Sequence, residues 1–175
     1  MPGSIIAIRV AQAIGFTGAA WLSGNIAALS ANAAPAIAKS VREDSISPKV
    51  ACKQWRDMYE AGKTQNPPVA AITASSFAYV AWSARQSPSI FASARYGGAG
   101  IYAVAAVLTL SIVPYTIATM SGTNDKLLGL AGSKADLSIS RAEVENLLSQ
   151  WTQLNWVRSL LPLAGSFVGI AAALL

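Results

Sequence analysis

Four stretches of the chain are apolar over lengths close to those needed to cross a bilayer. They run over about residues 4–29, 67–84, 99–120 and 151–175. A helix needs about 20 apolar residues to span a hydrocarbon core roughly 30 Å thick. We therefore expect an all-α protein, an integral membrane four-helix bundle in which residues 1–175 form a single transmembrane domain.

The composition agrees with a membrane protein and narrows the chemistry. Of 175 residues, 53% are hydrophobic and 12% are charged, which is too apolar for an ordinary soluble domain. This composition makes a lipid bilayer the expected partner. The basic residues behind the net charge of +5 are scattered along the chain without a dense patch, so we do not expect nucleic acid as a partner. The chain has no histidine and a single cysteine, Cys52. This excludes His-ligated metals, Cys-rich metal sites, an intramolecular disulfide and Ser-His or Cys-His nucleophiles.

The first apolar segment is predicted to be a retained helix, because it is longer than the apolar core of a typical signal peptide. An Ala-rich cleavage site near 31–34 is the competing interpretation. Residues 36–66 are predicted to form a loop followed by a short amphipathic helix over about 50–62, with Gly62 as its C-cap and Pro67-Pro68 opening the second span.

The third segment contains Pro114, which should free a backbone carbonyl and bend the helix. Residues 127–140 are predicted to be a loop. Ser140 and Glu143 then form an S-x-x-E capping box that starts the last helix. Further along that helix, Gly165 and Gly169 are predicted to allow close contact with a neighbouring helix.

The last helix carries a polar face at the point where it enters its apolar run. Trp151, Asn155 and Arg158 are spaced i, i+4, i+7, so they share one side. Snorkelling toward the headgroups would explain Arg158 alone. A polar pocket between helices explains all three residues together.

An up-down order of four spans brings polar and aromatic residues to one mouth of the bundle. These are Ser23, Asn25, Trp55, Tyr59, Tyr115, Asn124, Trp151, Asn155 and Arg158. For Trp55 and Tyr59, an interfacial aromatic belt is the alternative to a pocket wall. Most Lys and Arg residues also lie on this side, which places it toward the cytosol by the positive-inside rule.

Three motifs, in their order and spacing, resemble the anthrone oxygenase-like family of small four-helix membrane proteins. They are Trp55-x-x-x-Tyr59-x-x-Gly62 followed by prolines, Pro114-Tyr115-x-x-x-x-Met120-x-x-Thr123-Asn124, and Trp151-x-x-x-Asn155-x-x-Arg158. The resemblance implies a cofactor-free oxygenase of fungal aromatic polyketide biosynthesis, with an anthrone as substrate and molecular oxygen as co-substrate. A eukaryotic member is expected in an endoplasmic-reticulum-type membrane.

That chemistry gives the candidate residues roles. Arg158 would hold the charge of the enolate or peroxide, Asn155 and Asn124 would donate hydrogen bonds, and Asp125 is the preferred base because it adjoins Asn124. The other candidate bases are Asp57, Glu60, Tyr59 and Tyr115. The predicted substrate-binding residues are Trp151, Trp55, Tyr59, Tyr115, Ser23 and Asn25.

Other readings of the sequence remain open. A non-catalytic membrane scaffold would use the Trp151 face only to hold helices together. A carrier would need polar residues along the whole span, and the apolar run 165–175 argues against it. An enzyme acting on a different polyketide is also compatible with these residues, as is a homo-oligomer.

Overall fold

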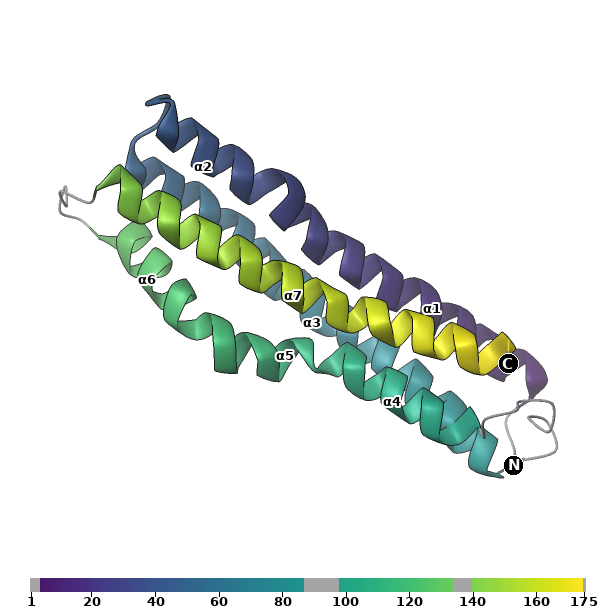
Figure 1. The fold of residues 1–175 in the computed structure, drawn as a ribbon. Helices are drawn as coiled ribbons and strands as arrows, with labels where there is room; N and C mark the ends of the chain where they lie inside the picture. Colours follow the sequence, from purple (N-terminus) through teal and green to yellow (C-terminus); the bar gives the residue numbers. More distant parts are fainter. Residues whose placement is uncertain (1–3, 87–97, 134–139, 175) are drawn as a thin grey trace. The chain divides into compact units, whose positions relative to one another are not determined.

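A computed structural model describes residues 4–86, 98–133 and 140–174, and within these ranges it contains helices and no strand (Figure 1). The elements are α1 (Ile5–Ala28), the π-helical turn η1 (Leu29–Ala33), α2 (Ala34–Arg42), α3 (Pro48–Gln86), α4 (Gly98–Leu110), α5 (Ile112–Tyr115), the π-helical turn η3 (Thr116–Met120), α6 (Ser121–Gly132) and α7 (Arg141–Leu174). They form four nearly continuous helical stretches, so the all-α, four-helix prediction is confirmed.

Three of these stretches are long and apolar enough to cross a membrane. They are Ile5–Arg42, Gly98–Gly132 and Arg141–Leu174. This finding supports a multi-pass membrane protein. The second predicted span, 67–84, lies within α3, which is not among the three, so a fourth crossing stays a prediction.

The structure corrects the prediction of a separate short helix before the second span. Helix α3 begins after Ser47, whose hydroxyl accepts a hydrogen bond from the Val50 N–H at 3.3 Å, and then runs unbroken through Gly62, Pro67 and Pro68. The two prolines deprive the carbonyls four residues earlier of their amide donors. Those carbonyls belong to exposed residues, where solvent or headgroups can satisfy them, so the helix continues.

Two predicted loops are also shorter than expected. α2 extends to Arg42 and α6 extends to Gly132, so helix occupies the first part of each region. The predicted start of the last helix is confirmed: the Ser140 hydroxyl accepts a hydrogen bond from the Glu143 N–H at 3.1 Å. Between α4 and α5 the helix is interrupted at Ser111, three residues before Pro114.

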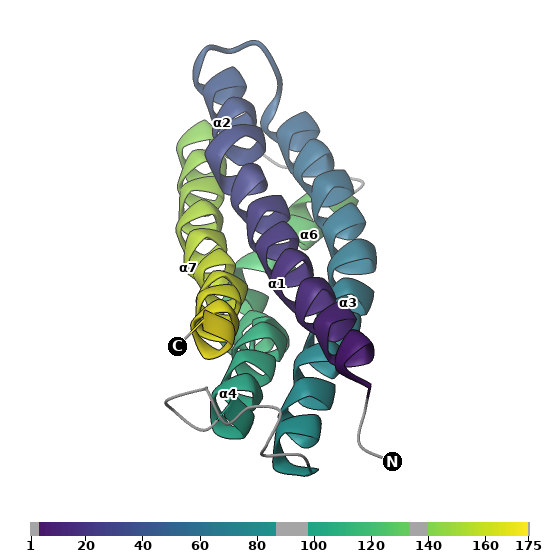
Figure 2. The same cartoon turned by 90° about the vertical axis from the view of Figure 1, so that its right-hand side faces the viewer.

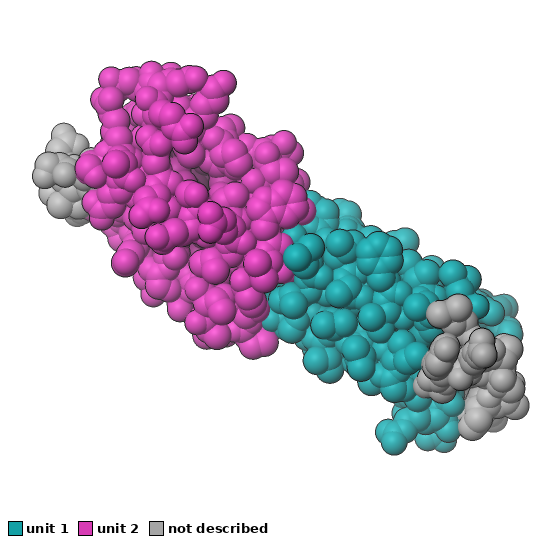
Figure 3. Space-filling view, viewed as in Figure 1, with its two compact units in different colours: residues 1–24, 66–113, 159–175 teal, residues 25–65, 114–158 magenta. Residues whose placement is uncertain are grey.

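The chain divides into two compact units (Figure 3). Unit 1 comprises residues 1–24, 66–113 and 159–175, and unit 2 comprises residues 25–65 and 114–158. In unit 2, α2 lies beside the start of α7 in both ribbon views (Figures 1 and 2), where Arg42 forms an ion pair with Glu145 at 3.0 Å.

Unit 1 is packed by small residues against aromatic rings. A methyl group added at Gly169 would lie 2.6 Å from the Phe77 ring and 3.0 Å from the Phe16 ring, and one at Gly165 would lie 2.8 Å from the Thr109 hydroxyl. The predicted close contact at these two glycines is therefore confirmed. The buried phenol of Tyr102 accepts a hydrogen bond from the Gln12 side-chain amide.

Unit 2 has a core of larger side chains contributed by all four of its helical segments. Its members are Ala34, Val41, Ala51, Cys52, Trp55, Met120, Leu127, Ala131, Val144, Leu147, Leu148 and Trp151. Two of them, Trp55 and Trp151, are the largest fully buried side chains of the described residues. Charged side chains surround this core on the outside.

Candidate functional site

Most of the predicted site residues come together in unit 2. On α7, Trp151 and Asn155 are 1% and 0% exposed, and Arg158 is partly buried. The Trp151 indole N–H donates a hydrogen bond of 3.1 Å to the Asn124 side-chain oxygen from α6. Asn124 is also buried, so this bond satisfies two polar groups that would otherwise be costly inside a core.

The Asn155 side chain faces the π-helical turn η1. Its amide nitrogen donates to the Ile26 carbonyl at 2.9 Å and to the Ser30 hydroxyl at 2.8 Å. Ser30 lies within η1 and is 2% exposed. Single π-helical turns inside α-helices are frequent at functional sites.

Arg158 faces the second π-helical turn, η3. Its guanidinium donates a hydrogen bond of 3.2 Å to the hydroxyl of Thr116, the first residue of η3. The phenols of Tyr59 and Tyr115 are the titratable groups close enough to interact electrostatically with it. Asn155 and Arg158 therefore connect α7 to both π-helical turns.

No described carboxylate pairs with Arg158. The ion pairs among described residues join Glu43, Asp57, Glu60, Glu145 and Asp44 to other Lys and Arg residues on the surface of unit 2. The Nε atom of Arg158 is buried and has no hydrogen-bond partner among the described residues. A partly buried cation without a counter-ion favours the binding of an anion.

Two aromatic side chains of α3, Trp55 and Tyr59, also belong to this cluster. Trp55 is fully buried, so its ring packs inside the unit 2 core. Its ring stacks on Tyr59 at 5.0 Å between centroids and meets Trp151 edge-on at 5.8 Å. Lys63 lies over the Tyr59 ring, 5.8 Å from its centroid. The Trp55 indole nitrogen is buried and has no partner among the described residues.

The remaining predicted residues occupy different positions. Tyr115 donates from its hydroxyl to the Leu154 carbonyl at 3.2 Å, so it belongs to the cluster. Asp125 is exposed, since on a helix it points about 100° away from its buried neighbour Asn124. Asn25 is partly buried in unit 2, whereas Ser23 is buried in unit 1.

Sequence reasoning missed Ser30 and Thr116, the partners of Asn155 and Arg158. A small polar residue inside an apolar run is a weak signal, because such side chains usually bond to their own helix. Each of the two π-helical turns that carry them has a proline two residues away, Pro35 after η1 and Pro114 before η3, and this is the one sequence signal that could have pointed to them.

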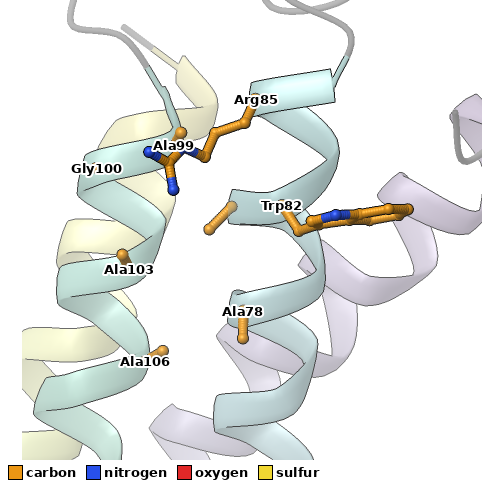
Figure 4. A pocket seen from close by; sticks show the side chains of 8 residues that line it. Ala78, Trp82, Arg85, Ala99, Gly100, Ala103 and Ala106 are labelled. Atoms are coloured by element: carbon orange, nitrogen blue, oxygen red, sulfur yellow. The ribbon is translucent and has the colours of Figure 1, made fainter.

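A separate groove in unit 1 has a volume of about 570 Å³ and lies between α3 and α4 (Figure 4). It is lined by Ala78, Ala81, Trp82, Arg85, Ala99, Gly100, Ala103 and Ala106. The Arg85 side chain extends toward the first turn of α4, while the Trp82 indole points away from α4 (Figure 4). None of the predicted site residues lines this groove.

Among the described residues, no group of three or more His, Cys, Asp or Glu side chains could hold a metal ion. The unit 2 cluster contains hydrogen-bonding groups, stacked aromatic rings and the positive charge of Arg158.

Comparison with known proteins identifies the family. The family model described as anthrone oxygenase matches residues 55–168, which include Trp55, Asn124, Trp151, Asn155 and Arg158. No solved structure matches the chain significantly.

Individual relatives agree with the family match. The chain is 36% identical over 174 residues to anthrone oxygenase encC of Aspergillus fumigatus, covering 92% of this chain and 91% of the relative. It is 32% identical to anthrone oxygenase AgnL2 of Paecilomyces divaricatus, with 91% and 92% covered. It is also 32% identical to a noranthrone monooxygenase of Aspergillus flavus, with 73% and 58% covered. The chain belongs to the anthrone oxygenase family.

Proposed function

We propose that this protein oxidises an anthrone to an anthraquinone with molecular oxygen, using the unit 2 cluster and no metal or flavin. The proposal rests on one observation: the partly buried guanidinium of Arg158 has an unpaired Nε and no carboxylate partner among the described residues. The names of the relatives support the substrate class.

The reaction begins with the removal of a proton from the anthrone methylene carbon. The electron pair left on carbon delocalises onto the keto oxygen, which becomes an enolate. A guanidinium placed at this oxygen stabilises the charge as it develops, in the manner of an oxyanion hole. Trp55, Tyr59 and Trp151 provide apolar surface for the rings.

Oxygen then reacts with the enolate carbon. A carbon–oxygen bond forms, two electrons pass from the organic ring system to the bound oxygen molecule, and proton uptake gives a hydroperoxide. Loss of water, which takes the second methylene hydrogen, breaks the O–O bond and forms the quinone carbonyl. One oxygen atom ends in the quinone and the other in water.

Asp125 is exposed, and the carboxylates of Asp57 and Glu60 form ion pairs on the surface. We therefore propose that the methylene proton passes to solvent. Catalysis then rests on lowering the energy of the enolate. This replaces the expectation that Asp125 is the base. We also propose that the protein acts from an endoplasmic-reticulum-type membrane with unit 2 toward the cytosol.

The test is quinone formation by purified, chelator-treated protein in detergent with an emodin-type anthrone under oxygen. We expect turnover that chelation does not affect, and a loss of about 100- to 1,000-fold in kcat for Arg158→Ala. Arg56→Ala is the matched control, because Arg56 is a surface guanidinium of the same unit paired with Asp57. A wild-type rate equal to spontaneous autoxidation, or equal losses in both variants at preserved folding, would refute the proposal.

A non-catalytic scaffold remains the second candidate. The hydrogen bonds of Trp151 to α6 and of Asn155 to α1 and η1 favour it, since they hold helices together. It predicts that Arg158→Ala changes only thermal stability.

A further inference from the structure

The hydrogen bonds of Asn155 fix which way its side-chain amide points. Its nitrogen lies 2.9 Å from the Ile26 carbonyl oxygen, which can only accept a hydrogen bond. Flipping the amide would place two oxygens together, so the observed orientation is set by this partner. The Ser30 hydroxyl, at 2.8 Å from the same nitrogen, adds a second anchor. The amide oxygen is therefore held on the opposite side.

That oxygen is a buried acceptor without a donor. Asn155 is 0% exposed, and its Oδ1 atom has no hydrogen-bond partner among the described residues. An unsatisfied buried acceptor costs free energy in the folded protein, and a ligand that brings a donor recovers that free energy. The ligand that fits must therefore carry an N–H or O–H group.

Two other buried donors in unit 2 also lack a partner among the described residues. The Nε of Arg158 follows three residues later on the same face of α7, and the Nε1 of Trp55 belongs to the ring that meets Trp151 edge-on. A carbonyl or enolate oxygen satisfies these donors. A carboxylate, a phosphate or a bare ketone would leave the Asn155 oxygen unpaired.

We infer that Asn155 determines the ligand specificity of this site: its side-chain oxygen accepts a hydrogen bond from a hydroxyl group of the ligand, which is a hydroxylated aromatic ketone. The aromatic ring system in this inference rests on the proposed function. The hydroxyl requirement rests on the geometry of Asn155 alone. Asn155 thus acts as an acceptor toward the ligand, whereas the sequence suggested a donor, because its own N–H groups are used by Ile26 and Ser30.

The test measures binding of the quinone product and does not require turnover. Quenching of tryptophan fluorescence gives Kd values for emodin, for fully O-methylated emodin and for unsubstituted anthraquinone. We expect emodin to bind about 10- to 100-fold more tightly than both of the others. Methylation of emodin removes its O–H donors but also makes the ligand larger. Unsubstituted anthraquinone lacks the donors and is smaller, so its weak binding would show that steric clash does not explain the difference in Kd.

Variants separate recognition from structural support. Asn155→Leu keeps the approximate size but has no acceptor, so the preference for emodin should fall to about one. Ser30→Ala loosens one anchor of the amide and leaves the acceptor in place, so the preference should persist. If Asn155→Leu does not fold, the three ligands on the wild-type protein decide the question.

Equal Kd values for the three ligands on the wild-type protein would overturn the role of Asn155. Quinone formation from the corresponding anthrones, measured in parallel, reports on the proposed function separately. Turnover without a preference for hydroxylated ligands would support the proposed oxygenase function and refute the role of Asn155. A preference for hydroxylated ligands without turnover would support the role of Asn155 and refute the proposed oxygenase function.

Discussion

In unit 1 small residues pack against aromatic rings, whereas the core of unit 2 is built around two buried indoles. In unit 1, Gly165 and Gly169 leave no room for a side chain. In unit 2, Gly129 has nothing within 4 Å of an added methyl group, and the core contains Trp55 and Trp151. Unit 1 therefore packs its helices closely at these two glycines, and unit 2 packs around the bulkier rings of Trp55 and Trp151.

Charge follows the same division. Every described acidic residue lies in unit 2, and the described basic residues of unit 1 are Arg9 and Arg85. Both π-helical turns also belong to unit 2. Continuous helices such as α7 therefore change character along their length, from a polar face at Asn155 to small-residue packing at Gly169.

The largest expected contrast is between matched glycine substitutions. Gly169→Ala places a methyl group 2.6 Å from the Phe77 ring, which should lower the free energy of unfolding by about 1–3 kcal/mol. Gly129→Ala in α6 meets no atom and should raise it by about 0.5–1 kcal/mol. Denaturation in detergent measures both. Equal effects would show that the two units do not differ in packing.

Buried hydrogen bonds should separate stability from activity. Asn124→Leu leaves the Trp151 N–H without its acceptor, so we expect a loss of about 1–3 kcal/mol together with slower quinone formation. Tyr102→Phe removes the partner of Gln12 in unit 1 and should destabilise the protein without slowing quinone formation per folded molecule. A slow Tyr102→Phe variant would place part of the chemistry in unit 1.

The reactivity of the Cys52 thiol measures how far solvent enters the unit 2 core. Burial raises the pKa of its thiol to about 11. Since the thiolate is the reactive form, modification by a maleimide at pH 8 should be at least about 100-fold slower than for a free cysteine. The folded thiol keeps its proton where an unfolded one has lost it, so stability should fall as the pH rises above 9 toward 11. Rapid labelling of folded protein at pH 8 would show that solvent enters this core.

The smallest effect is expected for Asp125→Asn. The side chain is exposed on α6, so the substitution should change kcat less than about threefold and leave stability within about 0.5 kcal/mol. The comparison with Asn124→Leu, one residue earlier, tests whether the buried face of α6 matters and its outer face does not. A 100-fold loss would restore Asp125 as the base.

The helices and several of their contacts could be predicted from sequence because they depend on local patterns. The apolar stretches and the Ser140 cap follow from nearby residues, and Gly165 indicated a close helix contact without identifying Thr109 as its partner. The continuation of α3 through Pro67 and Pro68 could not, because it depends on whether the freed carbonyls are exposed.

The site was predicted in part for a related reason. Helical spacing placed Trp151, Asn155 and Arg158 on one face, and the structure gives that face partners on α6 and on both π-helical turns. The choice of Ser30 and Thr116 as partners depends on how separate helices meet. The division that places Ser23 in unit 1 depends on the same tertiary packing.

The central claim is that Arg158 stabilises the enolate of the bound substrate. It is tested most directly without oxygen, by recording the absorbance of the anthrone enolate in the presence of protein while the pH is raised. We expect the wild-type protein to lower the pH of half-ionisation of the bound anthrone by about two units relative to Arg158→Ala. The same midpoint in both proteins, with equal binding of the anthrone, would contradict it.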